Sequence, residues 1–159
     1  MAVVKRASLA DLGSLRAVRL RALAESPEAF ASTLERELAM TDDEWVARME
    51  RGAWFLAVED GEDVGIVCSF PDPARPAAQH LVAMWVDPRI RGTTVAADLV
   101  GAVVSLSRAE GAGAVFLWVL DPNARARRFY ERLGFVDTGD RQPLPRDPSI
   151  GETRLALHL

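Results

Sequence analysis

Cysteine is nearly absent from this sequence, and long apolar runs are missing. The single cysteine, Cys68, cannot form an intramolecular disulfide, and its setting in GIVCSF is typical of a buried strand thiol in a reducing compartment. The N-terminal stretch MAVVKRASLADL lacks the apolar segment of a signal peptide, and no run approaches the ~18 apolar residues of a membrane span. We therefore expect a cytoplasmic protein with no membrane partner.

Several functional signatures are also lacking. The formal net charge of −4 argues against a dedicated nucleic-acid binder. There is no G-x-x-x-x-G-K-S/T phosphate loop, and GAGAVF lacks the third glycine of a dinucleotide fingerprint and precedes a strand instead of following one. We expect neither a nucleic-acid partner nor a metal site.

The composition that remains is that of an ordinary globular protein. The chain has 159 residues, of which 49% are apolar and 26% are charged. A chain of this length buries roughly two thirds of the surface that its unfolded form exposes. No repeat, linker or low-complexity tract interrupts it, so we expect one domain over residues 1–159.

Periodicity and capping signals predict the local elements. Helices are expected after the caps Ser8 and Thr41, from about 93 to 110, and up to Gly134; the segment 28–38 is ambiguous. A turn at DGED, with Gly61 at a positive φ, predicts a hairpin between the second and third strands. Strands are expected at 2–7, 53–59, 64–70, 80–86 and 114–120, and at 135–140 and 153–159 on either side of a proline-rich loop at 141–150.

The strands at 80–86 and 114–120 are nearly continuous apolar runs joined through a helix. This order predicts a central βαβ unit with two parallel strands and a right-handed crossover. The remaining strands form hairpins. The expected fold class is therefore α+β, with a mixed, mainly antiparallel sheet and flanking helices.

The junction VDPRIRGTTVAADLV, residues 86–100, carries the first chemical signal. The first amides of a helix have no partners within the helix and concentrate partial positive charge. Gly92 lets a ligand approach the backbone, Arg91 adds a cation, and Thr93 and Thr94 add hydroxyl donors, so a phosphate or pyrophosphate fits here. A tight turn with a solvated arginine is the alternative.

A second segment, NARARRFYERLGF at residues 123–135, follows the next strand. The two segments together resemble motifs A and B of the GNAT N-acetyltransferase superfamily, V-x-P-x-x-R/Q-G-x-G-I/V-G/A and N-x-x-A-x-x-F/L-Y-x-x-x-G-F. The resemblance covers residues 80–135 closely, and the order of elements elsewhere agrees. It implies the GNAT-like acyl-CoA N-acyltransferase fold and acetyl-CoA (coenzyme A) as the cofactor.

The resemblance assigns roles to individual residues. The backbone of Met84, Trp85 and Val86 would pair with the pantetheine arm and polarise the thioester carbonyl, and Asn123 would contact the cofactor from the neighbouring helix. Thr94 departs from the family, which usually has glycine there: its side chain either crowds the pyrophosphate or donates a hydrogen bond to it. The pyrophosphate would lie against Arg91, Gly92, Thr93, Thr94, Val95 and Ala96.

Acetyl transfer needs a neutral amine and a proton for the departing thiolate. Tyr130 would stand near the thioester sulfur. Its reference pKa is about 10, against about 8.5 for a thiol, so it holds its proton at neutral pH and can donate it as the thiolate forms. The alternative is a packing role on the apolar stripe of its helix. His80, eleven residues before Arg91, is a candidate general base with a reference pKa of about 6.5, or an exposed strand-edge histidine.

The acceptor site is the least defined part. The resemblance implies that residues 26–37 and the loop 141–150 shape it, and the acidic residues Glu25, Glu28, Glu35 and Glu37 either attract a cationic amine or face water. Arginines of the last helix either meet the 3′-phosphate or are solvated. We expect an N-acetyltransferase in which a primary amine of a small molecule or peptide attacks acetyl-CoA directly. A non-catalytic acyl-CoA-binding or regulatory module is the alternative, and a homodimer remains open.

Overall fold

The computed structural model describes residues 1–159, which form one mixed sheet of seven strands in the order β1-β2-β3-β4-β5-β7-β6. Every neighbouring pair is antiparallel except β4 and β5, which are parallel. The expected α+β class with a central βαβ unit is confirmed. The strands are β1 (Val3–Arg6), β2 (Ala53–Glu59), β3 (Glu62–Pro71), β4 (Gln79–Val86), β5 (Ala114–Leu120), β6 (Val136–Leu144) and β7 (Asp147–His158).

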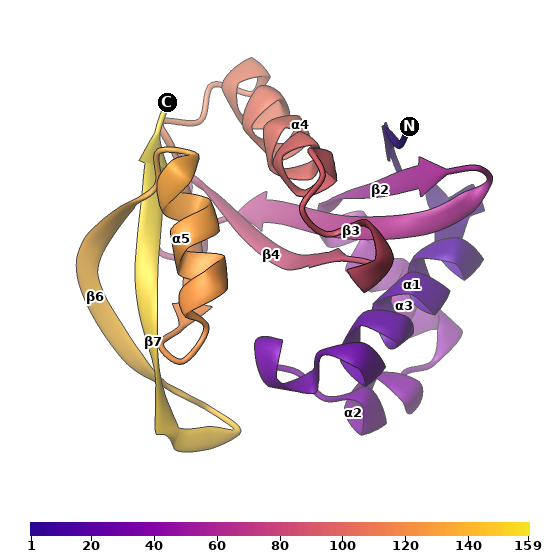
Figure 1. Cartoon of the computed structure of the whole chain (residues 1–159), viewed down its shortest axis with the longest axis horizontal. Helices are drawn as coiled ribbons and strands as arrows, with labels where there is room; N and C mark the ends of the chain where they lie inside the picture. The colour runs from indigo at the N-terminus through magenta and orange to yellow at the C-terminus, as the bar shows by residue number, and fades with distance from the viewer.

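Helices cover both faces of the sheet. On one face α4 packs against β1 to β5, and on the other α1 packs against β3 and β4 while α3 packs against β2. Figure 1 shows α5 with β6 and β7 on one side of the molecule and α1 to α3 on the other. None of the helices combines the length and apolar character needed to cross a membrane. The helices are α1 (Leu12–Glu25), α2 (Leu34–Leu38), α3 (Asp42–Arg51), α4 (Val95–Ala109) and α5 (Ala124–Arg132), with short 3-10 turns at Leu9–Asp11, Pro27–Ala29 and Pro88–Ile90.

Each face of the sheet has its own hydrophobic core. The helix expected from about 93 to 110 is confirmed as α4. It carries an apolar stripe in which Leu99 and Val103 are fully buried and pack with β5 residues and with Tyr130 of α5. Leu15 of α1 and Trp85 of β4 belong to the core on the opposite face. Burying this apolar surface on both sides holds the central strands in place.

Local signals in the sequence are also confirmed. The predicted cap at Thr41 is part of a capping box at the start of α3: Thr41 Oγ1 accepts from the Glu44 amide at 3.2 Å, and the Glu44 carboxylate accepts from the Thr41 amide at 2.9 Å. Strands β2 and β3 are joined by Asp60 and Gly61, both at positive φ (51° and 78°), as a two-residue hairpin turn requires.

The prediction of a proline-rich loop at 141–150 is wrong. Strands β6 and β7 extend through most of it, and only residues 145–146 remain as the turn. Pro143 is tolerated because β6 is the edge strand, where a missing backbone N–H need not interrupt the sheet. Pro148 lies where the register shifts between the two strands.

Candidate active site

The site begins where β4 and β5 separate. Their parallel pairing is limited to Gln79 with Val115 and His80 with Phe116, at the beginning of both strands. Further along β4 the register against β3 shifts, and Ala83 has a φ of 61°, which is rare for a residue with a Cβ. This irregularity bends β4 away from β5, and the two strands diverge towards their carboxyl ends.

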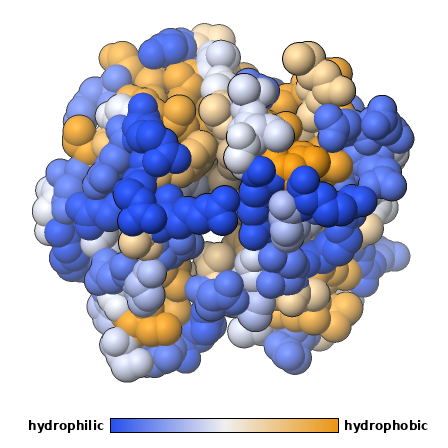
Figure 2. Space-filling model, in the orientation of Figure 1, coloured by the Kyte–Doolittle hydropathy of each residue, from blue (hydrophilic) through white to orange (hydrophobic).

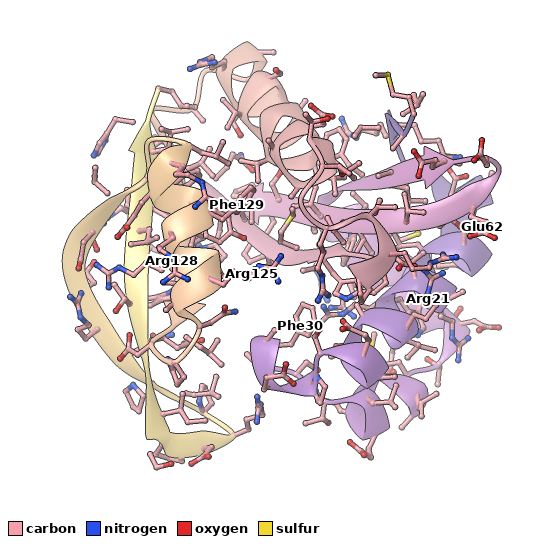
Figure 3. All side chains as sticks on the ribbon, viewed as in Figure 1. Arg21, Phe30, Glu62, Arg125, Arg128 and Phe129 are labelled. Carbon is pink, nitrogen blue, oxygen red and sulfur yellow. The ribbon has the colours of Figure 1, made fainter.

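A cavity of about 660 Å³ occupies this region. It is walled by the end of β4, the loop before α4, helix α5 and the segment that follows α1. In Figure 2 a depression with largely hydrophilic margins separates the two halves of the molecule. Figure 3 shows Phe30 on one side of this space, and Arg125 and Phe129 of α5 on the other.

The structure brings nearly all of the predicted cofactor residues together. Val95 is the exception, because its side chain is buried in the core under α4 instead of lining the cavity. The predicted residues that line the cavity are Met84, Trp85, Val86, Arg91, Gly92, Thr93, Thr94, Ala96, Asn123 and Tyr130.

The loop before α4 presents unpaired backbone amides. The amides of Gly92, Thr94, Ala96 and Ala97 make no hydrogen bond within the protein. Gly92 has a φ of 85°, and a Cβ added there would meet no atom within 4 Å, so the backbone is open to a ligand. Free amides at the start of a long helix form an anion site.

The two threonine hydroxyls of this loop point to protein groups. Thr93 donates to the Ile90 carbonyl oxygen at 2.7 Å and accepts from the Val95 amide at 3.4 Å. Thr94 donates to the Asp98 carboxylate at 3.0 Å. In this structure the backbone, and not the hydroxyls, supplies the free donors.

Arg91 is also engaged by the protein. Its Nε donates to the Val86 carbonyl oxygen at 3.0 Å, and its Nη2 donates to Glu25 at 2.8 Å. The side chain therefore folds back over the end of β4, although the residue still lines the cavity. Sequence spacing could not reveal this, since Glu25 lies 66 residues away.

Tyr130 lies on the inner face of α5 and is 7% exposed. Its ring makes edge contacts with Phe129 and Phe135, at centroid distances of 5.1 and 5.5 Å. The packing role considered for it is confirmed, and the residue also lines the cavity. Burial raises the pKa of its phenol well above the ordinary value, so the hydroxyl stays protonated at neutral pH. No protein group hydrogen-bonds to this hydroxyl.

Asn123 caps α5 from the edge of the cavity. Its Oδ1 accepts from the Ala126 amide at 3.1 Å, which satisfies one of the first amides of the helix. Its side-chain nitrogen makes no hydrogen bond in the protein and is available to a ligand.

His80 does not line this cavity. It lies where β4 and β5 still pair, with Nδ1 3.6 Å from Asp72 and its ring 5.2 Å from that of Phe70. Burial lowers the pKa of its imidazole, while Asp72 acts in the opposite direction. The structure thus separates His80 from the other predicted site residues.

Cys68 is buried, and burial raises the pKa of its thiol to about 12, which agrees with the buried strand thiol expected from the sequence.

The acidic residues considered for the acceptor have different surroundings. Glu28 lines the cavity, whereas Glu37 is buried and paired with Arg19 and Arg48. Desolvation opposes the charged form of Glu37, but hydrogen bonds from the two guanidinium groups prevail and lower its pKa to about 2. Glu37 is thus a structural anion and not a solvated helix residue.

Sequence reasoning missed the apolar lining. Phe30, Ile90, Phe129 and Leu133 line the cavity, and only the last two carried a signal, as part of the stripe of α5. Phe30 comes from the ambiguous segment, and its ring lies 4.7 Å from the Arg19 guanidinium.

Comparison with known proteins agrees with this geometry. The chain is 29% identical over 120 residues to a mycothiol acetyltransferase from Beutenbergia cavernae, covering 76% of this chain and 39% of that protein. It is 30% identical over 139 residues to an uncharacterized N-acetyltransferase from Mycobacterium tuberculosis, covering 84% and 88%. The chain thus spans about two fifths of the length of that mycothiol acetyltransferase.

The fold is shared with solved structures. One from Salmonella typhimurium, described with its cofactor acetyl-CoA, matches with a TM-score of 0.76 at 17% identity, over 100% of this chain and 94% of that one. The family described as Acetyltransferase (GNAT) matches residues 18–135, which is most of the chain. The chain belongs to the GNAT acetyltransferase family.

Proposed function

We propose that this protein is an acetyl-CoA-dependent N-acetyltransferase. One observation carries the proposal: the open amides before α4, the diverging end of β4 and the Tyr130 phenol share one cavity. These are the groups needed to bind a diphosphate, an extended thiol arm and a departing thiolate. The Salmonella structure with the same fold is described with acetyl-CoA, which supports this choice of cofactor.

In this proposal the diphosphate binds the amides of Gly92, Thr94, Ala96 and Ala97, and the pantetheine arm lies along Met84 to Val86. Backbone amides can stabilise a diphosphate without a metal ion because they combine hydrogen bonding with the positive end of the helix. The hydrogen bonds from the Arg91 side chain to Val86 and Glu25 hold the loop in position, and the backbone amides of the loop contact the diphosphate.

In this proposal the acetyl transfer takes place where Tyr130 lines the cavity. The neutral amine nitrogen bonds to the acetyl carbonyl carbon, the carbon–sulfur bond breaks, and Tyr130 gives its proton to the departing sulfur. The amine loses a proton to solvent, and Tyr130 regains one from solvent. Burial raises the pKa of the phenol, so the hydroxyl is protonated at neutral pH and carries a proton when the carbon–sulfur bond breaks. We propose no role for His80, because it lies outside the cavity.

The acceptor is a primary amine of a small molecule or peptide, bound between Phe30 and α5. Two measurements test the proposal: calorimetric titration with acetyl-CoA, and release of free thiol from acetyl-CoA over a panel of small amines and peptide N-termini. Binding with thiol release by at least one amine is expected. Binding without release by any amine supports the non-catalytic acyl-CoA-binding module, and absence of binding refutes both functions.

A further inference from the structure

A group of polar contacts joins α1 to the cofactor end of β4. Glu25, the last residue of α1, accepts hydrogen bonds through Oε2 from Trp85 Nε1 at 2.9 Å and from Arg91 Nη2 at 2.8 Å. The neighbouring Ser26 hydroxyl donates to the same oxygen. Arg91 continues the chain of contacts to the Val86 carbonyl oxygen at 3.0 Å.

The three donors belong to three different walls of the cavity. Trp85 lies on β4, Arg91 lies in the loop that presents the free amides, and Ser26 opens the segment that leads to Phe30. All three line the cavity, whereas Glu25 does not. The Glu25 carboxylate, which is outside the cavity lining, therefore connects β4 and the loop before α4 to the segment that leads to Phe30.

The neighbouring contacts support a fixed geometry at this point. The Arg21 guanidinium lies 5.3 Å from the Trp85 ring and donates to Asp87 at 2.8 Å, directly after β4. The end of β4 has left its partner β5, so contacts from α1 supply part of the support that a neighbouring strand would otherwise give. Hydrogen bonds to a charged acceptor are the stronger kind, and this carboxylate receives three.

We propose that Glu25 is a positioning residue that holds the end of β4, the loop before α4 and the segment after α1 in one arrangement, so that acetyl-CoA binding at the first two orders the acceptor wall. The inference rests on the proposed function, because it presumes that acetyl-CoA binds between β4 and α4.

A purely electrostatic role of Glu25 makes the opposite prediction. Its negative charge lies close to the site proposed for an anionic diphosphate, so by charge alone its removal would strengthen cofactor binding. A positioning role predicts weaker binding, because the free amides and the strand end then lose their common anchor. Whether the affinity for acetyl-CoA rises or falls when Glu25 is replaced therefore distinguishes the electrostatic role from the positioning role.

The experiment measures acetyl-CoA affinity by calorimetry for the full chain and for Glu25→Ala, Glu25→Gln and Glu50→Ala. The control Glu50 is an exposed glutamate of α3 that makes no ion pair. We expect Glu25→Ala to weaken binding about tenfold, which corresponds to about 1.4 kcal/mol, and Glu50→Ala to leave it unchanged. Glu25→Gln keeps an oxygen that can accept from Trp85 and Arg91, so we expect it to restore part of the affinity.

Hydrogen exchange of residues 26–33 provides a second readout, which loss of stability alone does not reproduce. In the unsubstituted protein acetyl-CoA is expected to slow exchange in this segment. In Glu25→Ala at saturating acetyl-CoA, that protection is expected to disappear, while residues 92–98 remain protected.

The outcomes are distinct. If the unsubstituted protein does not bind acetyl-CoA, the proposed function fails and the inference fails with it. If it binds and Glu25→Ala binds as tightly or more tightly, the function stands and the positioning role is wrong. Equal weakening by Glu25→Ala and Glu50→Ala, or unchanged protection of residues 26–33, also overturns it.

Discussion

Replacing Tyr130 with phenylalanine removes the proposed proton donor and little else. The ring keeps its edge contacts with Phe129 and Phe135, and the hydroxyl has no hydrogen-bond partner in the protein that would be left unsatisfied. The free energy of unfolding should therefore change by less than about 1 kcal/mol. The affinity for acetyl-CoA should also persist, because the diphosphate and pantetheine contacts are made elsewhere.

In contrast to stability and acetyl-CoA affinity, the rate of acetyl transfer should fall steeply in Tyr130→Phe. General acid catalysis contributes typically about 10²- to 10⁴-fold, so we expect kcat to fall at least about 100-fold, or about 2.7 kcal/mol of barrier. The assay follows free thiol released from acetyl-CoA with an accepted amine, beside calorimetric titration of the same variant. Tyr130→Ala is the matched comparison: it should lose activity and also stability, by about 3 kcal/mol, because the ring is removed from the core.

A kcat for Tyr130→Phe within twofold of the unsubstituted protein would refute the role of the phenol. A parallel loss of acetyl-CoA affinity would show instead that the hydroxyl serves binding. With an unchanged kcat, the thiolate would have to take its proton from water.

Three further results are expected. Thr94→Gly should tighten acetyl-CoA binding about threefold by calorimetry, because the Thr94 hydroxyl is directed to Asp98 and the substitution removes a side chain from the cavity lining. Weaker binding would indicate that the hydroxyl contacts the diphosphate. Glu37→Gln should destabilise the fold by about 3 kcal/mol in chemical denaturation, because it leaves Arg19 and Arg48 without their buried anion. The pKa of Glu37 is lowered in the folded state from 4.5 to about 2, so its stabilisation is complete above pH 4.5 and is lost as the pH falls towards 2. The stability gap between the two proteins should close over that interval, and a gap that persists at pH 2 would contradict the ion pair. Leu99→Ala should lower the free energy of unfolding by about 3 kcal/mol, because the Leu99 side chain is fully buried in the core under α4. In calorimetric melting the Tm should fall by about 6 to 12 °C. A shift below about 2 °C would mean that neighbouring side chains fill the cavity left by the substitution.

Much of the fold follows from local sequence. The capping box at Thr41, the turn at Gly61 and the stripe of α4 act within a few residues, so their outcome does not depend on the rest of the chain. The two spaced motifs also predicted residues that the structure brings together around one cavity, among them Tyr130 and the loop before α4, because the strand–helix order that the motifs require is itself local.

Other features depended on partners distant in sequence. The extent of β6 and β7 through a proline-rich segment follows from the position of β6 at the sheet edge, which no local pattern reveals. His80 carried the right chemistry, but the short pairing of β4 with β5 places it outside the cavity.

The sequence alone determined that this chain forms a βαβ unit whose helix begins after a glycine-containing turn, because hydrophobic periodicity and turn residues set those features locally. Only the tertiary structure decided that Glu25 would engage Arg91 and Trp85, that Phe30 would line the cavity and that Glu37 would be buried with two arginines. These contacts join residues far apart in the chain, and they form only when both faces of the sheet are packed.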